Sequence, residues 1–153
     1  MANERSLVLV KPDAMQRGLA GAVLQRLENR GLLLIGLKLM RVDQDLASRH
    51  YAEHEGKPFF AALVDYITSS PIIAAVFEGD SATSAIRNSV GVTNPSQAAA
   101  GTIRGDFGLE VGRNLVHASD SPESGERELA LFFTQEELVQ WSRDNERWIS
   151  ENP

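Results

Sequence analysis

The chain has 153 residues, of which 42% are hydrophobic and 24% charged, enough for one compact domain with a sizeable core. It contains no cysteine, which excludes disulfides, thiolate catalysis and cysteine-ligated metals, and its three histidines argue against a metal site built from several histidines. The net charge of −6 argues against a nucleic-acid-binding protein, and an anionic ligand would need cations gathered locally.

The first third of the chain alternates strand and helix patterns. Ser6–Val10 is a short run of apolar β-formers, which predicts a buried strand ending at Lys11. Ala20–Asn29 has apolar residues at helical spacing and predicts a helix, with Gly31 as its left-handed stop. Leu32–Val42 is rich in β-formers and predicts the second strand.

Two helices, a strand and a third helix follow. Asp43 is a good N-cap for a helix that runs to about His54. Phe59–Thr68 predicts another helix, and the apolar run Ile72–Phe77 predicts a third buried strand. Asp80 or Ser81 then caps a helix that continues to about Ser89.

The last third of the chain begins with a segment that shows no helical or strand periodicity. Gly91–Gly112 is rich in Gly, Thr, Asn and Ala and predicts a long loop, a kind of segment that is usually functional. Leu115–His117 predicts a short fourth strand. Ser121 followed by Pro122 begins a helix, and the capping box Thr134–Glu137 opens a last helix through Trp141.

Four short strands interleaved with helices predict an α+β fold. We expect a ferredoxin-like sandwich, with a four-stranded antiparallel sheet and helices packed on it, in a single domain over residues 1–153. A doubly wound parallel fold is the alternative, although the spacing between the first two strands is short for it. The N-terminus shows neither a leader peptide nor a membrane span, so we expect a cytoplasmic protein.

His117 is the residue with the most informative surroundings. It lies in the stretch Gly112–Asp120, shortly after the basic, glycine-containing segment Thr102–Gly108. A neutral imidazole is a nucleophile, and one held beside arginines and backbone amides can accept a phosphoryl group and pass it on. His117 as an ordinary polar residue at a strand end is the alternative interpretation.

A series of motifs resembles the nucleoside diphosphate kinase family, in order over nearly the whole chain. The most specific is Asn114-x-x-His117-x-Ser119-Asp120-Ser121, which resembles the family's phosphohistidine signature. The other blocks are Lys11-Pro12-Asp13, Gln16-Arg17-Gly18, His50-Tyr51, Pro58-Phe59-Phe60, Thr93-Asn94-Pro95 and Gly101–Phe107.

The resemblance implies transfer of the γ-phosphoryl group of a nucleoside triphosphate to a nucleoside diphosphate. The route is ping-pong through a phosphohistidine at His117, with broad base specificity. Glu128 orients the imidazole, and Ser119 is the intermediate partner between them. Lys11 and Tyr51 complete the implied catalytic set. Without the family, Glu128 would be a solvated helix carboxylate.

The resemblance also implies the nucleotide contacts. The phosphates are held by Lys11, Tyr51, Arg87, Thr93 and Arg104, and the sugar hydroxyls by Asn114 and Lys11. Phe59 and Val111 cover the two faces of the base, and stacking without contacts to base edges tolerates every base. Taken alone, Phe59 would be a core residue and Arg87 a solvated one.

Mg²⁺ is the implied cofactor, and the resemblance implies a homo-oligomer. Mg²⁺ is carried by the nucleotide phosphates rather than by a protein site, with Glu53 near the hydrated ion; His54 stands where some members have a phosphate-contacting histidine. A hexamer is preferred over a tetramer. Ala98–Ala100 stands where many members have a proline before Gly101, which affects a loop that lies at subunit contacts in the family.

Two other functions remain as alternatives. A nucleotide-binding or regulatory protein without turnover would lack at least one of His117, Lys11, Arg104 and Asn114, and all four are present. A ferredoxin-like nucleic-acid-binding protein would need a basic face and aromatic residues exposed on its sheet. The acidic charge and the aromatic content of 7% argue against it.

Overall fold

The computed structural model describes residues 3–152 and contains one four-stranded antiparallel sheet with the strand order β2-β3-β1-β4. The strands are β1 (Asn3–Val10), β2 (Leu33–Met40), β3 (Ile72–Asp80) and β4 (Val116–Ala118). β1 pairs antiparallel with both β3 and β4, and β2 pairs antiparallel with β3. The predicted α+β ferredoxin-like sandwich is confirmed, and the parallel alternative is wrong.

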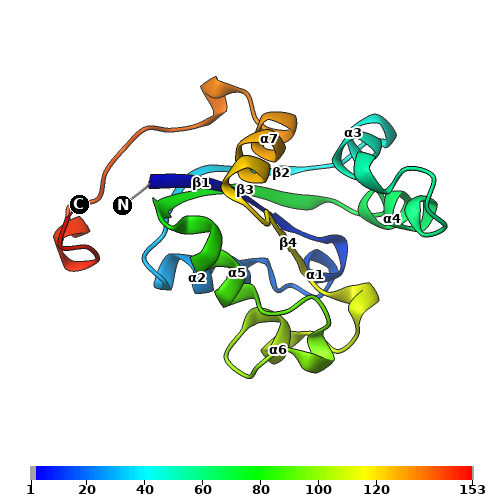
Figure 1. Ribbon diagram of the computed structural model, residues 1–153, viewed down its shortest axis with the longest axis horizontal. Helices are drawn as coiled ribbons and strands as arrows, with labels where there is room; N and C mark the ends of the chain where they lie inside the picture. The colour runs from blue at the N-terminus through cyan, green and yellow to red at the C-terminus, as the bar shows by residue number, and fades with distance from the viewer. Residues whose placement is uncertain (1–2, 153) are drawn as a thin grey trace.

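Helices cover both faces of the sheet (Figure 1). α3 (Gln44–His50), α4 (Phe60–Ile67) and α7 (Pro122–Phe132) pack around one core with Leu7, Leu9 and Val76. α2 (Ala20–Asn29) and α5 (Ala82–Val90) pack around a second core on the other face. Since the side chains of a strand alternate between faces, β1 contributes Leu7 and Leu9 to one core and Val8 and Val10 to the other.

Most predicted boundaries are close to the observed ones. The helix Ala20–Asn29 is confirmed at both ends, and Gly31 has the expected positive φ of 102°. Asp43 caps α3 by accepting a hydrogen bond from the Leu46 amide. Ser121 caps α7 through the Ser124 amide, with Pro122 at its first position.

Four predictions need correction. A short helix, α1 (Pro12–Gln16), follows β1 directly and was missed. α3 ends at His50, and only a 3₁₀ turn continues to His54. The expected loop Gly91–Gly112 contains α6 (Ile103–Phe107) between two 3₁₀ turns.

The fourth correction concerns the C-terminal segment. The capping box at Thr134 opens a single 3₁₀ turn rather than a helix. Beyond it the chain runs back along β2, where the Val139 amide donates to the Ile35 carbonyl at 2.8 Å and the Trp141 indole to the Leu34 carbonyl at 2.9 Å. The end of this arm, at Ser150 and Asn152, lies close to Asn3 at the start of β1 (Figure 1). No helix within residues 3–152 is long and apolar enough to cross a membrane.

Candidate active site

A cavity of about 610 Å³ opens where the end of β1, the end of α3, β4 and α7 meet. Its lining includes most of the residues expected to act on a nucleotide: Lys11, Tyr51, Arg87, Thr93, Arg104, Asn114, His117 and Glu128. A second cavity of about 450 Å³ lies under the C-terminal arm and is lined mainly by neutral and acidic residues. The first cavity is therefore the candidate site for an anionic ligand.

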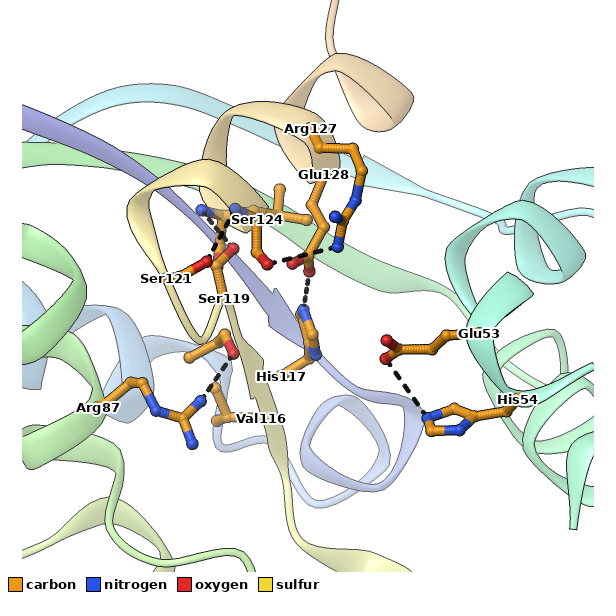
Figure 2. A network of polar contacts seen from close by, with 12 residues as sticks. Glu53, His54, Arg87, Val116, His117, Ser119, Ser121, Ser124, Arg127 and Glu128 are labelled. Atoms are coloured by element: carbon orange, nitrogen blue, oxygen red, sulfur yellow. Dashed lines mark hydrogen bonds and ion pairs between the residues drawn. The ribbon is translucent and has the colours of Figure 1, made fainter.

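His117 is placed in the cavity by β4 and oriented by α7. It pairs with Leu9 in the sheet, and its Nε2 contacts Glu128 Oε1 across the gap between β4 and α7 (Figure 2). A carboxylate only accepts hydrogen bonds, so Nε2 carries the proton in this pair. In the neutral ring the lone pair is then on Nδ1, the nitrogen available for a nucleophilic attack.

Ser119 does not stand between His117 and Glu128, as the sequence had suggested. Its hydroxyl is completely buried and exchanges hydrogen bonds with the main chain of Leu7, accepting from the amide at 3.3 Å and donating to the carbonyl at 3.4 Å. The expected intermediate position is wrong because Glu128, two turns into α7, reaches the imidazole directly. Ser119 instead ties the end of β4 to β1.

Lys11 brings a cation to the cavity at the end of β1. Its ammonium donates to Asn114 Oδ1 at 2.9 Å, and Asn114 Nδ2 donates to the Thr93 carbonyl at 3.1 Å. Burial, together with the nearby Arg104, lowers the pKa of Lys11 to about 8. The side chain is thus a cation whose charge is costly in the free protein and is favoured by an incoming anion.

Arg104 is a buried cation held by main-chain carbonyls. Its guanidinium donates to the carbonyls of Asn114 at 3.1 Å, Gly91 at 3.0 Å and Val116 at 2.6 Å. Burial, and secondly the neighbouring Arg87, lowers its pKa to about 10. Arg87 donates to the Ala118 carbonyl at 3.2 Å. Because these acceptors are neutral, the positive charges remain available to a ligand.

Asp13 fixes the backbone that leads into β4. Its carboxylate accepts from the Tyr66 hydroxyl and, at 3.0 Å, from the amide of Leu115. Leu115 is fully buried and has a φ of 74°, a left-handed conformation that non-glycine residues rarely adopt. The clamp of Asp13, Tyr66 and Leu115 therefore holds Asn114 beside Lys11 and sets the start of the strand that carries His117.

Two aromatic residues at the end of α3 complete the cavity wall. Tyr51 is buried, which raises the pKa of its hydroxyl to about 12, so that it remains a neutral hydrogen-bond donor. The His50 ring lies edge-on to His117 with 4.6 Å between ring centroids. Burial, with His117 as a lesser cause, lowers the pKa of His50 to about 3. The sequence motif contained His50 but gave it no role.

The residues expected to stack on a base lie outside the cavity lining. Phe59, at the start of α4, is 48% exposed with its ring 5.2 Å from that of His54, and Val111 is 54% exposed. Glu53 and His54 do line the cavity and approach one another at 3.6 Å (Figure 2). The structure thus gathers the phosphate-binding candidates in the cavity and leaves the base-binding candidates exposed outside its lining.

Comparison with known proteins gives one consistent family. The family model described as nucleoside diphosphate kinase matches residues 4–138. The nucleoside diphosphate kinase of Archaeoglobus fulgidus is 57% identical over 148 residues, covering 97% of this chain and 98% of the relative. The nucleoside diphosphate kinase of Chloroflexus aurantiacus is 61% identical over 150 residues, which cover 97% of this chain and 99% of the relative. Among solved structures, that of a halophilic nucleoside diphosphate kinase from Halobacterium salinarum in complex with CDP superposes with a TM-score of 0.94. The two sequences are 52% identical, and the match covers 97% of this chain and 99% of the other.

Proposed function

The chain belongs to the nucleoside diphosphate kinase family, and from this we propose that it moves the γ-phosphoryl group between nucleotides through a phosphohistidine at His117. The observation that carries the proposal is which nitrogen of the His117 imidazole is engaged by Glu128. Glu128 engages Nε2, and within residues 3–152 no hydrogen bond is made by Nδ1, in a cavity that Lys11, Arg87 and Arg104 also line.

The reaction proceeds in two half-steps. The Nδ1 lone pair attacks the γ-phosphorus of a nucleoside triphosphate, the bond from that phosphorus to the β-γ bridging oxygen breaks, and the nucleoside diphosphate leaves. A different diphosphate then enters and takes the phosphoryl group by the reverse step. Positive charge develops on the ring when Nδ1 forms its bond to phosphorus, and the Glu128 carboxylate on Nε2 stabilises it. One cavity serves both half-steps, which suits a ping-pong carrier.

The cations stabilise the transferred group. Phosphoryl transfer depends mainly on positioning and on electrostatic stabilisation of the phosphate oxygens. Lys11, Arg87 and Arg104 converge on the cavity with hydrogen-bond partners that leave their charges uncompensated. In the proposed complex Tyr51 and Thr93 donate hydroxyl hydrogen bonds to the phosphates, and Asn114 and Lys11 contact the sugar.

Broad base specificity follows from the proposed stacking. Phe59 and Val111 present exposed apolar surface without base-reading polar groups of their own. Apolar contacts to the faces of a base do not distinguish one base from another. Since both side chains lie outside the cavity lining, the base would sit near the entrance, with the phosphates directed inward to His117.

Mg²⁺ is proposed to arrive on the nucleotide. Among residues 3–152, the one grouping of three or more potential metal ligands is His50, His117 and Glu128, and two nitrogens with one carboxylate do not suit an ion that prefers six oxygens. The phosphates and water would supply those oxygens. The exposed carboxylate of Glu53 at the cavity is placed to accept hydrogen bonds from the water shell.

Intact mass after brief incubation with Mg-ATP and no acceptor tests the proposal. We expect the parent protein to gain one phosphoryl group that is labile in acid and is discharged by GDP, and His117→Ala to gain none while still binding nucleotide. Retention of the adduct in His117→Ala would place the nucleophile elsewhere. A parent protein that binds nucleotide but forms no adduct would indicate a nucleotide-binding protein without turnover.

A further inference from the structure

His50 is a partly buried residue whose two ring nitrogens are fully covered, and the proposed transfer gives it no role. Within residues 3–152, neither of its ring nitrogens has a hydrogen-bond partner. Most buried polar atoms in proteins are partnered, so such an exception points to a ligand or to a special role. The ring makes edge-on contacts with the rings of both Phe132 and His117.

His50, His117 and Glu128 form a compact set of metal-ligating groups. One ligand atom from each lies within 4.8 Å of the others. A tetrahedral Zn²⁺ with bonds of about 2.0–2.1 Å keeps its ligand atoms roughly 3.3 Å apart. An ion would therefore separate Glu128 from His117, which are now in direct contact, and draw His50 closer by a side-chain rotation. Two imidazoles and one carboxylate are a donor set that suits zinc and its neighbours in the transition series.

We propose that the nucleotide-free protein binds one divalent transition-metal ion, with zinc as the type case, through His50, His117 and Glu128. All three residues line the cavity, so an ion could reach His117 and Glu128 from it, and the His50 ring would turn to present a nitrogen that is now covered. Water from the cavity would fill the fourth position. This ion is distinct from the magnesium of the nucleotide, because the ligands are mainly nitrogen.

The cations of the cavity set the strength of this site. Lys11, Arg87 and Arg104 line the same cavity and oppose a second positive ion, while Glu128 provides the single carboxylate of the set. We therefore expect zinc to bind more weakly here than in a closed structural site, and nucleotide and zinc to compete for the empty cavity.

The consequence for activity rests on the proposed function. If His117 is the nucleophile, an ion bound together with Glu128 on the Nε2 side of the ring withdraws electron density from the imidazole and makes Nδ1 a weaker nucleophile. Zinc would then be a reversible inhibitor that a chelator relieves. Binding itself does not depend on that function, because it requires only the three side chains.

Calorimetric titration of nucleotide-free protein with Zn²⁺ tests the site. We expect one ion per chain in the parent and at least about tenfold weaker binding in His50→Gln. His54→Gln is the matched control, since His54 also lines the cavity and lies beside Glu53. Unchanged binding in His50→Gln, or a larger loss in His54→Gln, would overturn the proposal.

A second measurement covers the case in which His50→Gln does not fold. Co²⁺ bound to the parent should show the visible absorption of a four-coordinate site with nitrogen ligands, and Glu128→Gln should weaken it. An octahedral spectrum, or a spectrum unchanged in Glu128→Gln, would overturn the assignment. Both readouts use protein without nucleotide, so they remain valid even if the phosphohistidine adduct is never observed.

Discussion

Lys11 is a cation whose charge depends on the ligand. In the free protein, burial and Arg104 lower its pKa to about 8, with Asp13 acting in the opposite direction. A bound phosphate would favour the charged form again. The ammonium is therefore present below about pH 8 in the free enzyme and is lost as the pH rises through that value.

We expect kcat/KM for the nucleoside triphosphate to fall as the pH rises above about 8, because kcat/KM reports ionisations of the free enzyme. The turnover at saturating nucleotide should fall less over the same range, since the bound phosphates hold the proton on Lys11. Lys11→Arg keeps a positive charge over this pH range. Its kcat/KM should therefore show no decline near pH 8, even if the value is lower than that of the parent. A parent profile that stays level to about pH 10 would contradict this role.

The site could be predicted from the sequence only where a residue's role follows from its motif. The family resemblance that the motif around His117 carries implied roles for both His117 and Glu128, which the structure brings into direct contact. It placed Ser119 wrongly, because a hydroxyl next to a strand can bond either the partner strand or the helix, and only the packing decides. The roles of His50 and Asp13 depend on Phe132, Tyr66 and Leu115, which come from distant parts of the chain.

At the scale of elements, α6 shows where sequence patterns fail. Its five residues, Ile103–Phe107, are too few to display a helical period, so the segment resembled a loop. Its N-cap Thr102, whose hydroxyl accepts from the Gly105 amide, was the available signal. At Thr134 the error was the opposite one, because the capping box predicted a helix where only a 3₁₀ turn forms. Hydrogen bonds to β2 hold the residues that follow in an extended conformation.

Gly105 allows α6 to pack closely enough to carry Arg104 into the cavity. A Cβ built on it would lie 2.0 Å from the Ala99 carbonyl oxygen, closer than any real contact. We therefore expect Gly105→Ala to lower the free energy of unfolding by about 1–3 kcal/mol or more and to weaken nucleotide binding, because Arg104 moves with the helix.

The control for Gly105→Ala is Gly21→Ala in α2. A Cβ there meets nothing within 4 Å, and the residue lies in a helix. This variant should be neutral or more stable by roughly 0.5–1 kcal/mol. Denaturant unfolding of both variants measures the effect on stability, and nucleotide titration measures the effect on binding. If the two variants have the same free energy of unfolding, the backbone at Ala99 moves aside at little cost and the predicted role of Gly105 is wrong.

At the scale of the molecule, we propose that the chain assembles into a homo-oligomer, preferably a hexamer. β2 is an edge strand of the sheet, and within residues 3–152 the C-terminal arm hydrogen-bonds to its main chain only at Leu34 and Ile35, near its start. Farther along β2, Leu37 and Leu39 are 50% and 67% exposed. An edge strand with adjacent apolar side chains is a ready surface for pairing with another chain. Further large apolar side chains, Leu109 and Trp148 among them, are also exposed.

Leu39→Lys tests the contribution of β2 to assembly. We expect the charge to disfavour the association of two copies and to lower the mass measured by light scattering, while Leu109→Lys reports separately on the loop surface. Circular dichroism checks that each variant is folded. If Leu39→Lys keeps the parent mass, β2 is not an interface.

The fold itself was more predictable than the site. Short runs of apolar β-formers located all four strands, and helical spacing located α2 at both of its ends. What the pattern could not supply was the order of strands. Adjacent placement of β1 and β3 follows from contacts between distant segments, whereas the patterns describe only local preferences.

The three carbonyls that hold Arg104 have a kinetic consequence. A guanidinium paired with a carboxylate would contribute no net field, whereas one held by neutral dipoles attracts an anion at short range. The chain as a whole carries −6, so an approaching nucleotide meets repulsion at a distance and attraction near the cavity. If the local field governs the encounter, association of nucleotide should slow as salt is added, although net charge alone would predict that it quickens.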